Sequence, residues 1–329
     1  MTTGHVRLGR GELWALAGAL FYALSNVFSG AATRGYTLNP LLGAGMRALP
    51  TLFLCLALGW YPVPRSVRGW RTRTRRLAPT SPLADWRIFG ALTACGLAVF
   101  VTGGTLLFMA LQLGGVTVTT PITGTQVLWS AIIAAVLLGQ PLNRKMMLGM
   151  LVSVVGVCLL ALGRSGTLAL SPRWWLAVPL ATATALSWAL SGVFVAYVLK
   201  RGVNRFQAMA VSSLVGVLCI NAILAMGGNL SVYSATPGGV VLRLLLAGTL
   251  GMAGLLAFIS ALQHTTVASA NALNSLQVGL APLISWIVLG EAMNGWMALG
   301  VALMMSGVIV VQVSKPALDT DQRPASAAK

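Results

Sequence analysis

The chain has 329 residues, of which 57% are hydrophobic and only 8% are charged. Soluble domains average roughly 25% charged residues, so this composition excludes an ordinary soluble enzyme or binding domain and indicates an integral membrane protein. The formal net charge of +17 does not indicate nucleic-acid binding, because most basic residues lie in short segments between apolar runs, as membrane orientation requires.

Ten apolar runs are close to the length of about 20 residues that a helix needs to cross a bilayer. In chain order they are 13–33, 41–61, 88–113, 116–138, 146–163, 174–199, 206–226, 244–262, 267–290 and 296–313. The stretch between Arg87 and Arg144 has no charge and is too long for one crossing, so we divide it at Gly114-Gly115. A similar run is divided near His264. The sequence therefore predicts an all-α integral membrane protein with ten transmembrane helices.

The distribution of basic residues predicts the orientation of these helices. If both termini are cytoplasmic, the basic residues of the outer segments are Arg34, Arg164, Arg173 and Arg243. All other Lys and Arg residues are then cytoplasmic except Arg47, which lies within a helix. Cytoplasmic loops carry an excess of Lys and Arg. We therefore expect a multi-pass protein of the cytoplasmic (inner) cell membrane, with cytoplasmic ends at 1–11 and 315–329.

The segment 62–87 carries the densest group of arginines and is predicted to be a cytoplasmic loop. Such a loop attracts anionic lipid headgroups by about 1 kcal/mol per basic residue near the surface. We interpret it first as a determinant of topology and second as a contact with anionic lipid, with no nucleic-acid partner. The first apolar run could alternatively be a cleaved signal peptide, but its similarity to the sixth run argues against this.

The two halves of the chain repeat one another. Residues 19–28 (ALFYALSNVF) and 185–194 (ALSWALSGVF) are identical at seven of ten positions. Further along, the matched pairs are Gln126 with Gln277, Gly139 with Gly290 and Asn143 with Asn294. Apolar composition alone produces chance matches among Ala, Leu and Val, but not among Gln, Gly and Asn in one register.

The repeat predicts an inverted architecture. The first unit covers 12–163, a linker covers 164–173, and the second unit covers 174–314. Because each unit has an odd number of helices, five, the second enters the membrane from the opposite side. Two inverted five-helix repeats are typical of secondary transporters, whose substrate site lies near the bilayer midplane between the repeats.

Each half also contains the same turn, GQPLN at 139–143 and GEAMN at 290–294, followed by a helix with a matched pair of glycines. These features resemble the ten-helix EamA-type members of the drug/metabolite transporter superfamily, and the resemblance covers 12–313. It implies a permease, often an exporter of amino acids or other metabolites, with a central cavity lined mainly by helices one, three, four, six, eight and nine. The Glu usual in this turn is kept as Glu291 but is Gln140 in the first half. Arg47 matches an arginine common in the second helix of the family.

Polar and aromatic side chains inside the apolar helices are the candidate substrate-binding residues, because polar groups within lipid are costly and usually face a cavity or the bundle interior. The substrate-binding residues that we predict are Tyr22, Ser25, Asn26, Thr123, Gln126, Trp129, Trp188, Ser191, Asn271, Asn274 and Gln277. Hydrogen bonding between helices is the alternative interpretation of the polar residues. Plain packing is the alternative for the aromatic residues.

Arg47 and His264 are two further candidates. A guanidinium inside a membrane helix either snorkels outward or pairs, here with a substrate carboxylate. The acids of the chain are Glu12, Asp85, Glu291, Asp319 and Asp321, each at a helix end or in the tail. With no carboxylate mid-membrane, proton coupling through one is disfavoured, which leaves facilitation, exchange or coupling through His264.

The sequence therefore predicts a secondary transporter and not an enzyme. Its substrate is expected to be a small polar neutral or zwitterionic metabolite, moved by alternating access, with export implied by the resemblance. An organic-cation or multidrug exporter that uses the aromatic residues is the alternative. No cofactor or metal is predicted, since the four cysteines lie singly in apolar runs. The glycines at 149, 156, 300 and 307 predict close helix packing, and a homodimer contact is an additional expectation.

Overall fold

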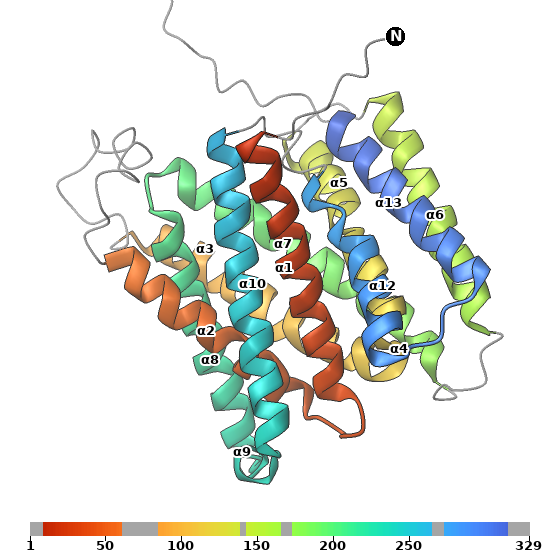
Figure 1. Ribbon diagram of the computed structural model, residues 1–329. Helices are drawn as coiled ribbons and strands as arrows, with labels where there is room; N and C mark the ends of the chain where they lie inside the picture. Colours follow the sequence, from red (N-terminus) through yellow and green to blue (C-terminus); the bar gives the residue numbers. More distant parts are fainter. Residues whose placement is uncertain (1–8, 61–84, 139–142, 166–172, 265–272, 315–329) are drawn as a thin grey trace, which may run out of the picture.

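The residues that the computed structural model describes are 9–60, 85–138, 143–165, 173–264 and 273–314. Within these ranges the chain is helical and contains no strand (Figure 1). The α-helices are α1 (Arg10–Thr33), α2 (Pro40–Trp60), α3 (Trp86–Gly96), α4 (Gly104–Gly124), α5 (Gln126–Leu138), α6 (Arg144–Ser165), α7 (Ala177–Lys200), α8 (Arg205–Met226), α9 (Val232–Ala235), α10 (Gly238–His264), α12 (Gln277–Leu289) and α13 (Gly295–Ser314). A π-helical segment, η3 (Leu97–Gly103), joins α3 to α4, and a short 3-10 segment, η4 (Trp174–Leu176), precedes α7.

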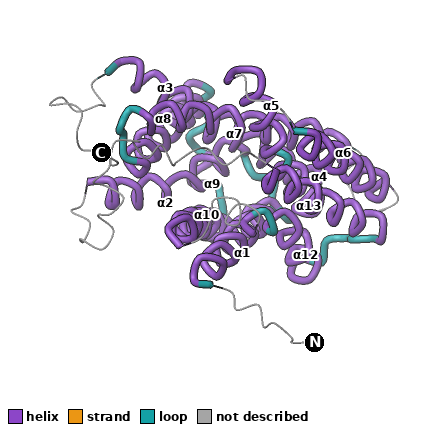
Figure 2. Tube along the Cα trace, turned by 90° about the horizontal axis from the view of Figure 1, so that it is seen from above, coloured by secondary structure: helices purple, strands orange, loops and turns teal. Residues whose placement is uncertain are grey.

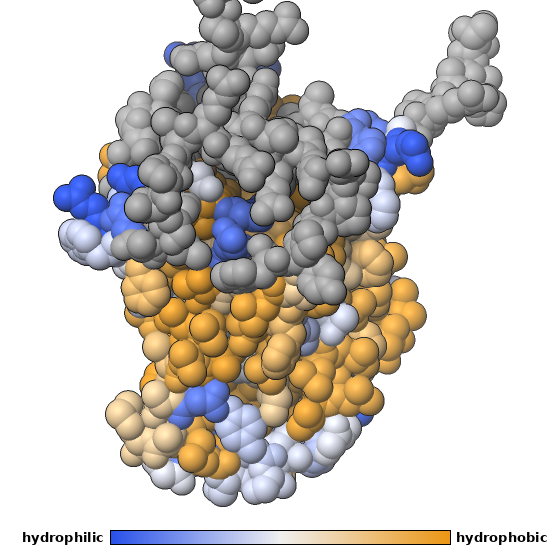
Figure 3. Space-filling view, turned by 90° about the vertical axis from the view of Figure 1, so that its left-hand side faces the viewer, coloured by the Kyte–Doolittle hydropathy of each residue, from blue (hydrophilic) through white to orange (hydrophobic). Residues whose placement is uncertain are grey.

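The surface of the molecule is that of a membrane protein. Six helical stretches of the described chain are long and apolar enough to cross a bilayer: Arg10–Thr33, Pro40–Leu58, Trp86–Ile133, Trp174–Leu199, Arg205–Met226 and Gly238–Ala261. Figure 3 shows an apolar band over the middle of one face, with hydrophilic side chains toward its two ends. Large apolar side chains such as Phe53 and Ile287 are 65% and 72% exposed, an arrangement that lipid stabilises and water does not. The prediction of an all-α, multi-pass membrane protein is confirmed.

The stretch Trp86–Ile133, 48 residues long, breaks at Gly115. This residue has a φ of 68° and a ψ of −176°, a backbone conformation that only glycine adopts readily. The chain therefore begins a new helical arm at Val116, as predicted from the sequence. The corresponding division predicted near His264 falls at 265–272, outside the described residues. Residues 62–84 of the loop predicted at 62–87, residues 166–172 of the linker predicted at 164–173, and the tail from 315 onward also lie outside them.

A second kind of break, which we did not predict, occurs at matched places in the two halves. The N–H of Thr125 donates to the carbonyl of Ile122 at 3.0 Å, directly before α5 begins. The N–H of Leu276 donates to the carbonyl of Leu273 at 3.1 Å, directly before α12 begins. These tight bonds to the third preceding residue interrupt the α-helical pattern. Both interrupted helices resume at a glutamine.

The helices pack in pairs that repeat between the halves. α1 packs along α10, α7 packs along the arm formed by α3, η3 and α4, and α6 packs along α13 (Figures 1 and 2). The last pair meets at glycines: a Cβ at Gly156 would lie 2.7 Å from the carbonyl oxygen of Gly300, and one at Gly307 would lie 2.5 Å from that of Gly149. The predicted close packing is therefore found within one chain, so these glycines lend no support to a homodimer contact.

Candidate functional site

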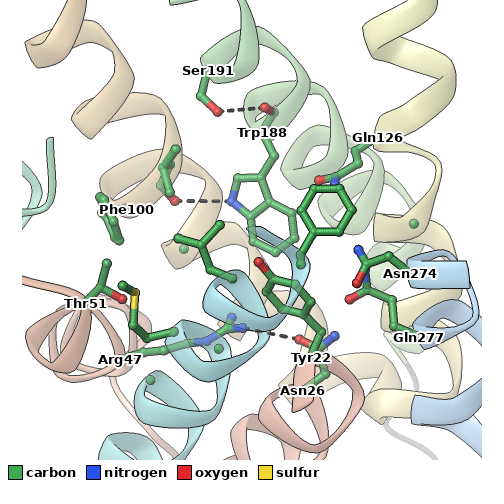
Figure 4. Close-up of a pocket in the computed structure, with 18 of the residues that line it drawn as sticks. Tyr22, Asn26, Arg47, Thr51, Phe100, Gln126, Trp188, Ser191, Asn274 and Gln277 are labelled. Carbon is green, nitrogen blue, oxygen red and sulfur yellow. Dashed lines mark hydrogen bonds between the residues drawn. The ribbon is translucent and has the colours of Figure 1, made fainter. Parts of the chain in front are cut away.

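A cavity of about 490 Å³ lies between the two halves, and both halves line it. This volume is within the range of about 300–1,000 Å³ that is common for small-molecule sites. The polar and aromatic lining residues are Tyr22, Asn26, Arg47, Thr51, Phe100, Phe108, Gln126, Trp188, Ser191, Arg205, Phe258, Asn274, Ser275 and Gln277 (Figure 4). Among the described residues that line the cavity there is no acid.

Tyr22 on α1 and Trp188 on α7 occupy matched positions of the repeat and both project into the cavity (Figure 4). Each ring packs against a glycine of the other half. A Cβ at Gly254 would lie 3.0 Å from Cδ2 of Tyr22, and a Cβ at Gly103 would lie 2.6 Å from Nε1 of Trp188. The missing side chains let each ring approach the backbone of the neighbouring helix, so the two halves seat their aromatic residues in the same way.

The π-helical segment η3 holds Trp188 in place. The indole Nε1 donates to the carbonyl of Val99 at 3.3 Å, and the hydroxyl of Ser187 donates to the carbonyl of Ala98 at 2.7 Å. A π-helical turn disturbs the regular hydrogen bonding of its helix, and such turns are frequent at functional sites. Here the turn offers two carbonyls to α7, and these orient the indole at the cavity wall.

Arg47 on α2 points into the cavity rather than outward to the membrane surface (Figure 4). One Nη atom donates to Oγ of Ser25 at 3.1 Å and to Oδ1 of Asn26 at 3.4 Å. Ser25 in turn donates to the carbonyl of Ala247 on α10 at 2.6 Å. Neither partner is an acid, so the positive charge of Arg47 is oriented by these hydrogen bonds but is not neutralised by them.

Three side-chain amides, those of Gln126, Asn274 and Gln277, line another part of the cavity. Figure 4 shows them on the opposite side of the Tyr22 and Trp188 rings from Arg47. Gln126 and Gln277 are the first residues after the two matched helix breaks. The Oδ1 atom of Asn274 is buried and has no hydrogen-bond partner among the described residues. Since a buried polar atom without a partner is costly, this oxygen is suited to accept a hydrogen bond from a ligand.

Arg205, the first residue of α8, also lines the cavity, and sequence reasoning missed it. From the sequence, Arg205 was interpreted only as one of the basic residues that indicate a cytoplasmic segment. A sequence signal was present: Asn204 is an N-cap that accepts a hydrogen bond from the N–H of Phe206 at 3.0 Å, which places Arg205 in the first helical turn. The lining residues Thr51, Phe100 and Phe258 were missed as well, because single residues of these types in apolar helices are not distinctive.

Several predicted residues do not line the cavity. Ser25 is fully buried behind Arg47, and the hydroxyl of Thr123 donates within its own helix to the carbonyl of Thr120 at 2.9 Å. Trp129 lies outside the lining. His264 is exposed at the end of α10, with Nδ1 2.9 Å from the carbonyl oxygen of Ser260. Asn271 falls outside the described residues. The predicted residues that the structure brings together at the cavity are Tyr22, Asn26, Arg47, Gln126, Trp188, Ser191, Asn274 and Gln277.

Glu291, the conspicuous acid of the second-half turn, is not at the cavity. Its carboxylate accepts hydrogen bonds from the backbone N–H of Val116 at 2.9 Å and from that of Thr117 at 2.7 Å. It therefore caps the helical arm that begins after Gly115. The described acids Glu12 and Asp85 lie in the first turn of α1 and at the N-cap of α3, also outside the cavity lining.

Comparisons with known proteins agree with the repeat. The model of the EamA-like transporter family matches twice, over residues 9–162 and 175–313. One solved structure, described only as "Crystal structure of protein", is 18% identical with a TM-score of 0.56, covering 93% of this chain and 99% of that chain. At this identity the likeness shows the fold alone. No curated protein sequence matches the chain.

Proposed function

The chain belongs to the EamA-like transporter family, and on that premise we propose that it is a secondary transporter, independent of ATP, that exports a small polar metabolite. The family consists of transporters and not enzymes. The proposal includes ten membrane-crossing helices in two inverted repeats, both termini in the cytoplasm, and a location in the cytoplasmic membrane. Export is taken over from the resemblance to the family.

The observation that carries this proposal is the composition of the cavity wall. Matched residues of the two halves, Tyr22 with Trp188 and Gln126 with Gln277, line one cavity. A site built at the interface of two repeats changes its access from one side of the membrane to the other when the repeats rock against each other. The helix breaks before the two glutamines are of the kind that secondary transporters place at their substrate sites.

The lining favours a polar substrate with an acidic group over an organic cation. Amides can donate to and accept from a ligand, and Arg47 offers a guanidinium that suits a carboxylate. An organic cation would meet positive charge and no described acid. The aromatic pair alone supports the cation-exporter alternative, so we keep the polar metabolite as the proposed substrate.

The proposal is tested with purified protein in liposomes that are loaded with a small-molecule extract of the host cells, the cells that naturally make the protein. Mass spectrometry of the interior before and after incubation is expected to show loss of one compound or a small group of related compounds. Trp188→Ala is expected to slow this loss. The matched control is Gly192→Ala on the same helix, where an added Cβ meets nothing within 4 Å. If no compound leaves faster than from protein-free liposomes, the proposed function is wrong.

A further inference from the structure

The charges at the cavity do not balance. The guanidinium groups of Arg47 and Arg205 both line it. The acids of the whole chain are Glu12, Asp85, Glu291, Asp319 and Asp321. The first three lie away from the cavity lining, and the last two follow the end of α13 at Ser314, beyond the described residues. None of the described acids lies in the cavity lining beside the two cations.

Both guanidinium groups keep hydrogen-bond donors for a ligand. A guanidinium has five N–H donors. With the described residues, Arg47 uses only one Nη atom, toward Ser25 and Asn26. Arg205 makes no hydrogen bond to the residues that the structure describes. Two half-buried cations with unused donors and no acid in the lining can donate to an anionic group.

Tyr22 lies near both cavity arginines. Its phenol lies within range of the charges of both Arg205 and Arg47, and its ring projects into the same cavity (Figure 4). Both guanidinium groups therefore border the space that a ligand in this cavity would occupy. On the opposite side of the aromatic pair from Arg47, the neutral amides of Gln126, Asn274 and Gln277 line the cavity.

The sign of the substrate's charge follows from these contacts. Burying like charges without a counter-charge is unfavourable, so a bound anion stabilises the occupied cavity. A zwitterion brings its own ammonium group and leaves the net charge of the site unchanged, while a cation increases the repulsion. The neutral amides suit an uncharged polar remainder, such as hydroxyl, carbonyl or amide groups.

Resting on the proposed function, we propose that the substrate is a small organic anion whose acidic group binds Arg47 and Arg205, and that the membrane potential drives its export. A membrane potential that is negative inside pushes anions outward. No described acid lines the cavity to carry a coupled proton. An anion needs none, because its own charge couples its movement to the potential.

The test sorts the substrate by charge. A host-cell extract is separated by ion exchange at pH 7 into anionic, neutral plus zwitterionic, and cationic fractions, and each fraction is loaded into separate proteoliposomes. Valinomycin with a tenfold outward K⁺ gradient makes the interior negative. A monovalent anion should then distribute about tenfold toward the outside, and a divalent anion about 100-fold. Reversing the gradient should reverse the direction.

Three variants assign the effect to the cavity. Arg47→Gln and Arg205→Gln are each expected to slow loss from the anionic fraction at least tenfold. Arg144→Gln, an exposed arginine at the start of α6 outside the cavity lining, should behave as the parent protein. The melting temperature of each variant is measured alongside, and two independent arginine variants keep the test informative if one does not fold.

The outcomes separate the two proposals. Loss confined to the anionic fraction, dependent on the potential and on both cavity arginines, supports the inference. The inference is overturned if compounds are lost from the neutral plus zwitterionic fraction or from the cationic fraction. It is also overturned if the loss of anions does not change with the sign of the potential. In both cases the transport function stands. No loss from any fraction overturns the transport function itself.

Discussion

The carboxylate of Glu291 accepts a hydrogen bond from the backbone N–H of Thr117 at 2.7 Å, and so ties the turn after α12 to the helical arm that begins after Gly115. The side-chain hydroxyl of Thr117 donates to the same carboxylate. Because the first N–H groups of a helix lack partners within it, this contact is an N-cap in which one half of the chain caps a helix of the other half.

Replacing this carboxylate should therefore affect stability first. We expect Glu291→Gln to lower the stability of the purified protein by up to about 1 kcal/mol, the usual size of a lost N-cap, because the amide offers one acceptor oxygen to the two N–H groups that the carboxylate binds. Transport by the folded protein should persist. The control is Asp85→Asn, an exposed N-cap that accepts from the N–H of Arg87 at 2.9 Å, where the loss should be smaller. Abolished transport at an unchanged melting temperature would show that Glu291 takes part in transport.

For the two glutamines at the helix breaks we expect the opposite result, weaker substrate binding without a loss of stability. The side-chain amides of Gln126 and Gln277 have no hydrogen-bond partner in the described part of the chain, so a change to Leu leaves no buried partner unpaired; the 2.8 Å bond from Ser130 Oγ to Gln126 goes to the backbone carbonyl and is kept. Each substitution is expected to weaken substrate binding about five- to tenfold, the value of one hydrogen bond, and to leave the melting temperature nearly constant. Destabilisation with unchanged affinity would identify them instead as contacts between helices.

The glycines behind the aromatic rings test how Tyr22 and Trp188 are seated. A Cβ at Gly103 or Gly254 would approach these rings to 2.6 Å and 3.0 Å, so each ring must move. Gly103→Ala and Gly254→Ala are expected to reduce transport several-fold and to lower stability by about 1–3 kcal/mol, as overpacking does. The matched change Gly192→Ala, which meets open space, should have neither effect. Equal behaviour of all three variants would contradict the role given to the rings.

The orientation in the membrane is checked with reporter fusions. Fusions at Lys145 and Arg201 are expected to report the cytoplasm, because an excess of Lys and Arg predicts a cytoplasmic segment. Fusions at Arg34 and Gly228 are expected to report the outside. If Arg34 and Lys145 report the same side, the number of crossings between them is even, and the predicted inverted arrangement is wrong.

Much of the site could be predicted from the sequence because the repeat places similar residues at matched positions of the two halves. Tyr22 and Gln126 were predicted through their mates Trp188 and Gln277, and the cavity brings all four together. Arg205 has no mate and lies at a helix end, where topology already explains a basic residue. Thr123 was predicted on its polarity, but a hydroxyl on a helix can bond to a preceding carbonyl of the same helix, and a sequence does not show which partner it takes.

The contacts that orient the site residues could not be predicted from the sequence. Nothing in Leu97–Gly103 marks a π-helical segment, since its residues are ordinary for an apolar helix. Its effect, two carbonyls offered to Ser187 and Trp188, depends on contact with α7. The cap supplied by Glu291 likewise depends on α12 and α4 lying together, a long-range contact that no local pattern contains. By contrast, the break at Gly115 was predictable because glycine is the residue that permits it.

Alternating access of the cavity is the central claim, and cysteine labelling tests it most directly. Ser191 lines the cavity, so Ser191→Cys is made with Cys158 and Cys219 changed to Ser, and treated with a membrane-impermeant thiol reagent in whole cells and in inverted vesicles. Ser231→Cys, in the turn predicted to lie outside, and Arg144→Cys, at the end of α6 predicted to be cytoplasmic, serve as controls for each side. We expect Ser191→Cys to be modified from both sides. Modification from one side only, while both control cysteines react as expected, would contradict the account.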